Sequence, residues 1–456
     1  MNLTVLYEDN HIIVIAKPVN VPVQADDTGD VDVLSQVKAY IKEKYNKPGE
    51  VYCGLVHRLD RPVGGVMVFA RTSKAASRLM PQFAQKGSSG AKKRYAAVVC
   101  GKAPAAARLE DDMVKDEATR TSYIVPAGTE GAKHASLDFT RISVKNGLSL
   151  LDVELHTGRH HQIRAQLANA GLPRWGDQRY NPEAKPGRQI ALWAYSLEIE
   201  HPVKHERMRF TALPPAGLGV WDGFADELRG LACRLPVAYS DENIIIINKP
   251  AGLPTAIADG GDDTAEGRLS SAFGEVYAVH RLDAPTSGLL IFARNEKAKA
   301  ELENSIRQRT IKKTYRLIAL GSPEEKSGRL RLFAVKDGEG ARVRVFDGER
   351  PGAVEMITDY RVVKYLDGAC LIEAELVTGR THQIRASFAH IGCPILGDDK
   401  YGDREKNRDP RFKALHKRGE LCLCACAVEL GFDKDSPLAY LNGKRFNTEP
   451  PFGERK

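Results

Sequence analysis

VHRLDRPVGGVMVFAR, at residues 56–71, decides the fold of this chain, because residues 279–294 repeat it as VHRLDAPTSGLLIFAR. Each copy has an arginine two positions before an aspartate, then Pro and Gly, and then an apolar run as long as a buried strand. The pattern predicts a shaped loop that carries Asp60 or Asp283 and leads into that strand. A single copy would suggest only a salt bridge in a loop. Two copies, each followed by further matching segments, indicate a reactive group on a loop that a rigid element supports.

The repeat extends in both directions from this stretch. Each copy opens with a strand, a turn and a second strand that ends in Lys-Pro. Each continues after the aspartate with a basic turn into a strand, a long strand that ends in Thr-Gly, a helix, and a Gly-Asp motif. The matching segments, first copy before second, are residues 5–18 and 237–250, 92–99 and 312–319, 149–158 and 370–379, 159–164 (RHHQIR) and 380–385 (RTHQIR), and 176–180 (GDQRY) and 397–401 (GDDKY).

The repeat divides the 456 residues into two domains, each long enough to bury a full core. We expect the domains at residues 1–215 and 236–456, joined by a linker at 216–235 with a short helix across 222–231. In the first copy Asp32 can cap a helix, and Ser73 can cap the next one, as Asn295 can in the second copy. The polar tail from Asn442 is expected to be loosely held.

The net charge of +8 and the isoelectric point near 8.9 fit a polyanionic partner. No stretch approaches the roughly 18 consecutive apolar residues of a membrane span. The N-terminal residues lack a charged region followed by an apolar signal core. The sequence therefore predicts a cytoplasmic protein with no membrane contact, and it indicates no protein partner, so we expect a monomer.

Three of the eight cysteines, Cys422, Cys424 and Cys426, alternate along one short apolar segment. A metal site is one interpretation, but alternation places all three on one face of a strand and no paired ligands complete a tetrahedral set. The first copy has Ala191, Trp193 and Tyr195 in the matching positions. We therefore interpret the segment as a core strand and expect no bound metal.

Both copies resemble the RluA-type pseudouridine synthases, which act on ribosomal and transfer RNA. The resemblance rests on HRLD before an apolar strand, Lys-x-Tyr at a strand entry, and TGRxHQIR followed by GDxxY, in that order and twice. It implies an α+β fold with two tandem domains, each a mixed, mainly antiparallel sheet with flanking helices and a basic cleft. It also implies that specific uridines in ribosomal or transfer RNA are flipped out and isomerised to pseudouridine, without a cofactor.

The resemblance also implies roles for individual residues. An aspartate attacks the ribose as nucleophile or acts as a base, and an arginine keeps it ionised, typically lowering such a pKa by about 1–3 units. A tyrosine stacks on the uracil and handles a proton. Without the resemblance, these arginines would be read as surface residues of a helix and these tyrosines as ordinary strand residues. The implied catalytic residues are Asp60, Asp283, Tyr95, Tyr315, Arg164 and Arg385.

Further basic residues are expected to bind the RNA. Arg58 and Arg281 of HRLD are placed to fill the gap left by the flipped base and to contact phosphate. The histidines of the motifs are expected to form structural hydrogen bonds rather than to take part in catalysis. The implied RNA-binding residues are Arg58, Arg281, Lys93, Lys313, Arg159 and Arg380, and the histidines are His57, His280, His161 and His382.

The two copies differ near these motifs. Pro-Thr-Ser-Gly follows HRLD in the second copy, whereas the first has Pro-Val-Gly-Gly; the first also has His160 for Thr381 and Arg174 for Ile395. None of these changes removes the implied Asp, Tyr or Arg. Three hypotheses remain open: two working sites, one working half beside an RNA-positioning half, or an RNA-binding protein that does not catalyse.

Overall fold

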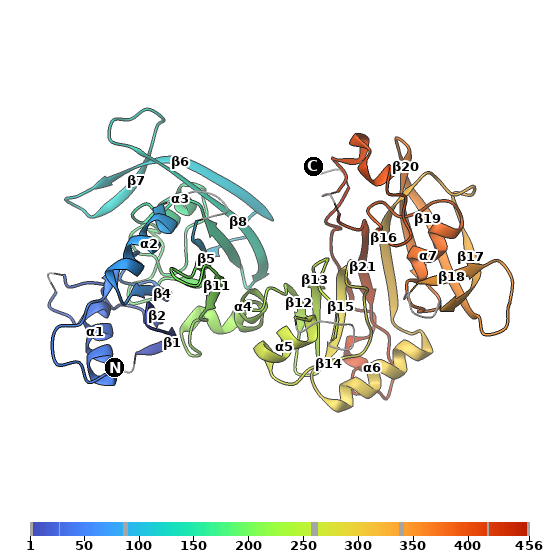
Figure 1. The fold of residues 1–456 in the computed structure, drawn as a ribbon, viewed down its shortest axis with the longest axis horizontal. Helices are drawn as coiled ribbons and strands as arrows, with labels where there is room; N and C mark the ends of the chain where they lie inside the picture. Colours follow the sequence, from blue (N-terminus) through green and yellow to red (C-terminus); the bar gives the residue numbers. More distant parts are fainter. Residues whose placement is uncertain are drawn as a thin grey trace. The chain divides into compact units, whose positions relative to one another are not determined.

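The computed structural model describes residues 3–26, 28–84, 90–256, 263–336, 342–416 and 419–453. The chain forms two compact units, Met1–Ala232 and Cys233–Lys456 (Figure 1). Each unit is built on a sheet of its own, and the elements of the first recur in the same order in the second.

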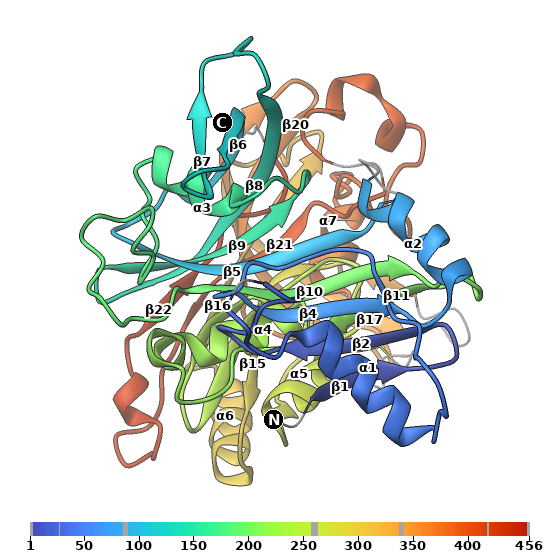
Figure 2. The ribbon, with the colours of Figure 1, turned by 90° about the vertical axis from the view of Figure 1, so that its left-hand side faces the viewer.

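The first unit has the strand order β1-β2-β4-β10-β5-β9-β8-β6-β7, with β3 paired to β4 and β11 paired to β10. Strands β4 and β10 are parallel, and the other pairs are antiparallel. Strands β6 and β7 form a hairpin that extends beyond the rest of this unit (Figures 1 and 2). The strands are β1 Thr4–Glu8, β2 Ile12–Lys17, β3 Gly54–Leu55, β4 Gly64–Ala70, β5 Lys92–Cys100, β6 Ala106–Asp116, β7 Thr121–Val125, β8 Lys133–Lys145, β9 Leu148–Leu155, β10 Leu192–Glu200 and β11 Arg207–Thr211.

The second unit repeats this order as β12-β13-β15-β21-β16-β20-β19-β17-β18, with β14 paired to β15 and β22 paired to β21. Its parallel pair is β15 with β21. The predicted mixed, mainly antiparallel sheet is thus confirmed in both units. The strands are β12 Val237–Ser240, β13 Ile244–Lys249, β14 Tyr277–Ala278, β15 Ser287–Ala293, β16 Lys312–Leu320, β17 Ser327–Lys336, β18 Val343–Phe346, β19 Val354–Leu366, β20 Ala369–Leu376, β21 Leu423–Glu429 and β22 Arg445–Asn447.

The helices of the first unit flank its sheet on both faces. Helices α1 and α3 share a core with Tyr95 on one face, and α2 packs on the other face. Helix α1 is capped by Asp32, whose carboxylate accepts from the Ser35 amide at 2.9 Å. Helix α2 is capped by Thr72 rather than by the predicted Ser73, since Thr72 Oγ1 accepts from the Ala75 amide at 3.1 Å. The helices are α1 Val33–Lys44, α2 Ser73–Ala84 and α3 Gln162–Asn169 in the first unit, with α5 Ala265–Phe273, α6 Glu296–Gln308 and α7 Gln383–His390 in the second.

The parallel pair in each unit begins directly after the aspartate loop. Gly65 has φ of 127°, and a Cβ there would lie 2.2 Å from the Ala194 carbonyl oxygen, so only glycine fits. Gly64 is needed for another reason, since a Cβ there would lie 2.2 Å from the Trp193 ring. In the second unit Ser287 and Cys424 replace Gly64 and Trp193. Because cysteine is smaller than tryptophan, it leaves room for the serine side chain.

Most of the predicted linker, residues 216–235, is folded onto the first unit. It forms a 3₁₀-helix, η1 (Gly219–Phe224), and helix α4 (Ala225–Ala232). Trp221, Phe224 and Leu228 are buried in one cluster with Trp193. The first unit therefore extends to Ala232 and includes most of the segment expected to be a linker. Apolar residues at helical spacing are the sequence signal for this packing.

The second unit closes the corresponding end of its sheet with other segments. In the first unit Lys145, at the end of β8, donates to the Gly223 carbonyl of η1 at 3.0 Å. In the second, Phe412 of a 3₁₀-helix, η4 (Pro410–Phe412), lies beside Gly368 in the β19–β20 turn. The tail contributes strand β22 and a bond from the Gly453 amide to the Leu415 carbonyl at 2.7 Å. The expectation of a loosely held tail is wrong for residues 442–453.

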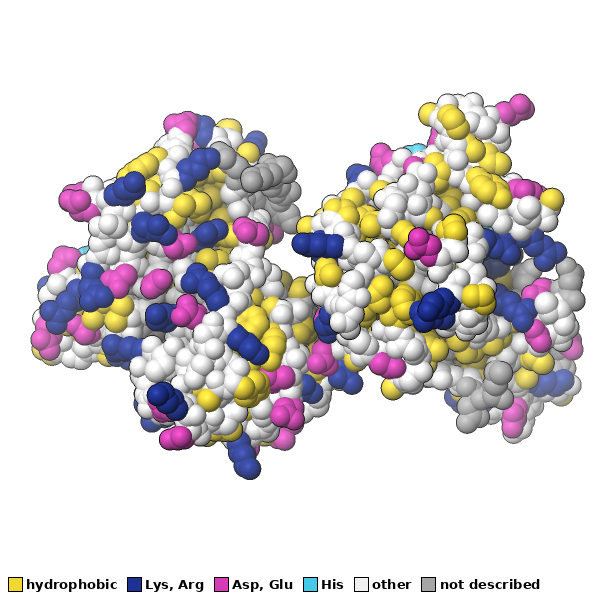
Figure 3. All heavy atoms as spheres, turned by 180° about the vertical axis from the view of Figure 1, so that it is seen from behind, with side chains coloured by type: hydrophobic (Ala, Val, Ile, Leu, Met, Phe, Trp, Pro, Cys, Tyr) yellow, Lys and Arg dark blue, Asp and Glu magenta, His cyan; other side chains and the backbone are white. Residues whose placement is uncertain are grey.

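Among the residues that the structure describes, no helix is both long and apolar enough to cross a membrane. On the face drawn in Figure 3, Lys and Arg side chains are interspersed with Asp and Glu rather than gathered in one patch. The three alternating cysteines lie on β21 and just before it, and all are buried, as expected for a core strand.

Candidate active site

The loop that carries Asp60 joins β3 to β4, and the loop that carries Asp283 joins β14 to β15. Asp60 begins a tight turn in which the Val63 amide donates to its carbonyl at 3.0 Å, and the Thr286 amide donates to the Asp283 carbonyl at 2.9 Å. The two carboxylate side chains are 26% and 18% exposed, so each can meet a ligand that enters from solvent.

A buried lysine ties each loop to the end of a strand. Lys17, the last residue of β2, donates to the Arg61 carbonyl at 3.0 Å, and Lys249, the last residue of β13, donates to the Ala284 carbonyl at 3.1 Å. Burial lowers the pKa of Lys17 to about 7, against the charge of nearby Asp60. These lysines were not predicted to support the loops, although the Lys-Pro motif occurs at the same place in both copies.

In the second unit Arg385 of α7 lies between two carboxylates. Its Nη1 is 3.2 Å from Asp283 Oδ2, while Nε and Nη2 donate to the two oxygens of Asp398 at 2.8 Å each. Arg385 is 5% exposed and Asp398 is 1% exposed. The bidentate pair fixes the plane of the guanidinium and leaves one nitrogen to face the loop aspartate.

The first unit has the same arrangement around Arg164 of α3. Its Nη1 is 3.4 Å from Asp60 Oδ2, and Nε and Nη2 donate to Asp177 at 3.1 and 2.7 Å. Burial alone would raise the pKa of Asp177, but hydrogen bonds from Arg164 and the charge of Arg174 lower it to about 2. The pKa of Asp398 is likewise lowered by Arg385 despite its burial. Both buried carboxylates are therefore ionised at neutral pH.

Asp177 and Asp398, in the repeated Gly-Asp motifs, were not predicted as site residues. The signal was the spacing, because each aspartate follows its arginine by the same number of residues in both copies. In a single copy this spacing would say little, because the length of the loop could set it. The same spacing in both copies, across a helix and a turn, indicates that the arginine and the aspartate are in contact.

The residues between Thr-Gly and the arginine form the turn that starts the helix. In the second unit Thr378 Oγ1 and the Arg380 amide both donate to Gln383 Oε1, at 2.9 and 3.0 Å. His382 has φ of 54°, in the left-handed region, and directly precedes α7. Thr157, Gln162 and His161 repeat this turn in the first unit. The turn aims the arginine at the aspartate loop.

A tyrosine of the Gly-Asp motif holds this turn in place. Tyr401 Oη is 2.9 Å from His382 Nδ1 and accepts from the Val343 amide at 2.9 Å. Tyr180 makes the same contacts with His161 at 3.0 Å and with the Ser122 amide at 2.9 Å. The histidines thus link the tyrosine to the site: His161 Nε2 is 3.6 Å from Asp60, and His382 Nε2 is 3.9 Å from Asp283.

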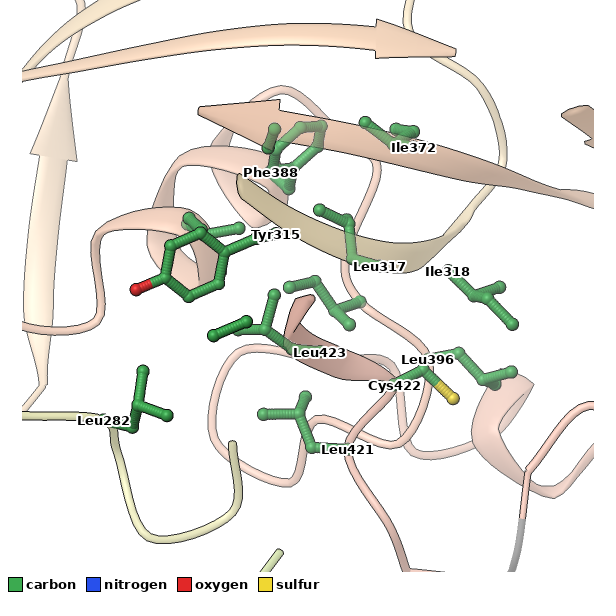
Figure 4. Close-up of a cluster of buried hydrophobic side chains, with 14 of the residues drawn as sticks. Leu282, Tyr315, Leu317, Ile318, Ile372, Phe388, Leu396, Leu421, Cys422 and Leu423 are labelled. Carbon is green, nitrogen blue, oxygen red and sulfur yellow. The ribbon is translucent and has the colours of Figure 1, made fainter. Parts of the chain in front are cut away.

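Tyr95 of β5 and Tyr315 of β16 are 8% and 5% exposed and lie near the loop aspartates. Burial raises the pKa of each phenol, and the charge of Asp60 or Asp283 raises it further, so both stay protonated across the physiological range. Figure 4 shows Tyr315 at the edge of an apolar cluster, with its hydroxyl oxygen pointing away from Leu317. The ring is fixed by the core while the polar atom stays outside it.

Arg174 distinguishes the first site from the second. This side chain is 1% exposed; its Nη2 contacts Asp177, while Nε and Nη1 have no hydrogen-bond partner. Burial lowers its pKa to about 10. The matching residue, Ile395, is apolar, and Asp398 accepts instead from the Lys400 and Tyr401 amides at 2.8 and 3.0 Å.

The residues predicted to bind RNA differ in exposure. Arg58 and Arg281 are exposed, as are Arg159 and Arg380, whose Nε atoms donate to the His134 and Glu355 carbonyls at 2.9 and 3.3 Å. Lys93 and Lys313 are only partly exposed, and burial lowers the pKa of both ammonium groups. A Cβ at Gly158 would lie 3.5 Å from Lys93 Nζ, so this lysine points toward the TGR turn.

The histidines of HRLD contact the main chain. His57 Nε2 accepts from the Val68 amide at 3.1 Å, and His280 Nε2 accepts from the Ile291 amide at 3.2 Å. Burial lowers the pKa of His57 to about 3, with a smaller effect from Lys93. In the described part of the chain, no group of His, Cys, Asp and Glu is arranged to hold a metal ion.

Comparison with known proteins gives matches over each half of the chain. The family model described as RNA pseudouridylate synthase matches residues 11–169 and 243–390, which together exceed half of the chain. Ribosomal large subunit pseudouridine synthase C of Rickettsia conorii is 38% identical over 207 residues, 44% of this chain and 65% of that protein. The match therefore spans just under two thirds of the Rickettsia protein.

Two further matches cover nearly the whole of a smaller protein. Dual-specificity RNA pseudouridine synthase RluA of Pasteurella multocida is 32% identical over 223 residues, 48% of this chain and 94% of that protein. The solved structure of human RNA pseudouridylate synthase domain containing 4 is 22% identical, covers 50% of this chain and 94% of its own, and gives a TM-score of 0.40. With two separate matches to one family model, this chain belongs to the RNA pseudouridylate synthase family and carries two tandem copies of its domain.

Proposed function

We propose that the chain isomerises uridine to pseudouridine in ribosomal or transfer RNA, with one reaction site in each unit. The observation that carries the proposal is the recurrence of one charge arrangement. In each unit a buried arginine lies between a partly exposed aspartate and a buried one, and its contacts to the two carboxylates are at most 3.4 Å long in the first unit and 3.2 Å in the second. Family membership supplies the reaction class.

In this reaction the N1–C1′ bond of uridine breaks, the base turns, and a C5–C1′ bond forms. The proton on C5 is lost to solvent and N1 gains one, so atoms and charge balance. We assign Asp60 and Asp283 as the carboxylates that act on the ribose, as nucleophile or base. Arg164 and Arg385 would hold each carboxylate in place.

Tyr95 and Tyr315 fit the role of stacking on the uracil, because each ring is fixed and keeps its phenolic proton. Exposed Arg58 and Arg281, two residues before the aspartates, suit the gap left by a flipped base. The RNA backbone would contact Arg159, Arg380, Lys93 and Lys313. We further propose that the chain acts as a monomer in the cytoplasm.

One working half beside an RNA-positioning half is the second candidate. The first unit departs more from the common arrangement, since Arg174 shares Asp177 with Arg164 and the loop contact to Asp60 is longer than its counterpart. A protein that binds RNA without catalysis is disfavoured, because both units keep the buried arginine and its two carboxylates.

RNA labelled with tritium at C5 of uridine distinguishes these candidates, because isomerisation releases the label. We expect Asp60→Asn and Asp283→Asn each to stop release from its own set of positions and to leave RNA binding within a few-fold. Asp399→Asn, an exposed neighbour in the Gly-Asp motif, is the control that should change nothing.

Full release by the double variant would disprove the assignment of both carboxylates. Loss of all release by Asp283→Asn, with normal release by Asp60→Asn, would leave only the second half catalytic. Absence of release by the unaltered chain on RNA from cells that lack it would favour the non-catalytic reading.

A further inference from the structure

His160 is an exposed aromatic ring beside the first site, and the second unit has Thr381 in its place. One face of the His160 ring stacks on the His161 ring, with 3.8 Å between centroids and 25° between planes. Its Nδ1 is 2.9 Å from Ser122 Oγ. This exposed residue makes no other hydrogen bond or ring contact with the described residues, which leaves the other face of the ring and its Nε2 edge for a ligand.

This ring is close to the reacting centre of the proposed function. His161, on which it stacks, contacts Arg164 Nη1 at 3.0 Å and lies 3.6 Å from Asp60 Oδ2. Only the thickness of the His160 ring therefore separates its open face from His161, the residue beside the Asp60 carboxylate. A base at that face would belong to a nucleotide next to the one held at Asp60.

The ring is also held still and uncharged. The contacts with His161 and Ser122 fix both of its torsions, so little side-chain entropy is lost when a ligand stacks on it. Partial burial lowers the pKa of His160, and the charges of Lys115, Arg164 and Arg179 add to this effect against that of Asp60. Fixed aromatic faces beside cations are what unpaired RNA bases and their phosphates bind.

We propose that His160 stacks on the nucleobase adjacent to the target uridine and gives the first site a flanking-base contact that the second site lacks. The inference rests on the proposed function, because it takes the flipped uridine to lie at Asp60. In the second unit Thr381 replaces His160 and Val343 replaces Ser122. That unit therefore has neither the aromatic ring nor the hydroxyl group that contacts it.

The test isolates the first site with Asp283→Asn and adds His160→Thr, the residue of the second unit, or His160→Phe, which keeps a ring. The substrate is C5-tritiated RNA from cells that lack this chain. We expect His160→Thr to lower kcat/KM about 5- to 150-fold, mainly through KM, the range for loss of one base stacked on an aromatic side chain. His160→Phe should stay within about threefold of the parent. In the Asp60→Asn chain, where only the second site reacts, His160→Thr should leave kcat unchanged.

Two results would overturn the inference: His160→Thr with unchanged kinetics, or His160→Phe as impaired as His160→Thr, which would mean that a ring nitrogen matters and the ring face does not. If the Asp283→Asn chain releases no tritium, the proposed function fails in the first unit and binding decides the inference. Single-stranded RNA that contains 2-aminopurine is then the probe, because stacking quenches its fluorescence. Loss of quenching with His160→Thr and its retention with His160→Phe would support stacking, and equal quenching by all three chains would refute it.

Discussion

Arg385 and Arg164 each neutralise two carboxylates, and one of the two is fully buried in both units. If Arg385 were removed, Asp283 and Asp398 would both lose their arginine partner, whereas in the first unit Asp177 would keep its contact with Arg174. Removal of one partner of a buried ion pair typically costs about 3–5 kcal/mol, because the remaining charge cannot be hydrated. A lysine would not restore the contact, since a single ammonium cannot form the bidentate fork to Asp398.

We expect Arg385→Met to abolish turnover at the second site and to lower the free energy of unfolding of that unit by about 3–5 kcal/mol. Arg164→Met should abolish turnover at the first site at a smaller cost in stability, because Arg174 still pairs with Asp177. Arg385→Lys should recover folding more than turnover. Tritium release measures turnover and circular dichroism in urea measures unfolding. Normal kinetics and normal melting in both Met variants would show that the buried arginines are dispensable.

Asp177 predicts a pH dependence of stability for the first unit. Its pKa is lowered from 3.8 to about 2 in the folded chain, so its carboxylate stabilises the fold above pH 4 and this contribution is lost as the pH falls to 2. The loss should be about 2 kcal/mol. All three tryptophans, Trp175, Trp193 and Trp221, lie in the first unit, so their fluorescence follows it alone.

Asp177→Asn should remove this acid-sensitive part of the unfolding curve, whereas Glu130→Gln, an exposed control, should keep it. An identical pH profile for the unaltered chain and Asp177→Asn would contradict the assignment of the low pKa to this group.

Among the elements, the parallel pair β4–β10 has different side chains from its counterpart, β15–β21. The difference is tolerated because the two facing residues differ together, a small one opposite a large one in the first unit and two of intermediate size in the second. Gly64 leaves space for the Trp193 ring, whose Nε1 donates to the Ala212 carbonyl at 2.7 Å, whereas Ser287 faces Cys424. The divergence of the first copy after HRLD is thus a packing exchange beneath the loop, and it leaves Asp60 where Asp283 is.

We expect Gly64→Ser to destabilise the first unit by about 1–3 kcal/mol, since the new side chain overpacks against the indole ring. Adding Trp193→Cys should recover most of the loss, although the single Trp193→Cys change is itself destabilising. A double-mutant cycle followed by the remaining tryptophans measures this coupling. Additive effects would show that the two positions are independent.

The repeated strands could be predicted because apolar runs and turn residues are local signals, and so could the arginine that faces each aspartate, through resemblance. The partners Asp177, Tyr180 and Lys17 were missed, because their doubled motifs mark them in the sequence without showing which distant group each side chain meets. The packing of residues 219–232 was missed because the segment follows a Pro-Pro pair and was read as a connection. Trp221, Phe224 and Leu228 show in hindsight that its apolar spacing outweighs the turn signal.

At the scale of the whole molecule, the point of division determines which pieces can fold. A chain that ends at Pro215 lacks Trp221, Phe224, Leu228 and Leu231, all buried in the first unit. Burial of each such side chain contributes about 1.5–3 kcal/mol. We expect a fragment of residues 1–232 to unfold cooperatively in urea and a fragment of residues 1–215 to show no cooperative transition; equal stability of the two would refute the packing argument.

Binding should reveal whether the two units share one RNA. Affinity for single strands falls with salt by about 0.7 log units per phosphate neutralised, so the intact chain should show a steeper slope than the 1–232 fragment. Linked units also raise each other's effective concentration, so affinity should exceed that of either fragment by far. Fluorescence anisotropy over a salt series measures both. Matching slopes and affinities for fragment and intact chain would mean that the units act on separate RNAs.

The β4–β10 pairing also determines when the first unit can fold during synthesis. Gly64 and Gly65 bond to Trp193 and Ala194, about 130 residues later in the chain, so the loop of Asp60 has no finished support until β10 exists. Pairings between such distant segments form slowly, and domains fold as units from the N-terminus during synthesis. We therefore expect the first unit to become protease-resistant only after residue 232 is free of the ribosome, a point that limited proteolysis of stalled nascent chains would locate. The first domain would be complete while the second is still being translated, and two near-identical sheets would avoid exchanging strands.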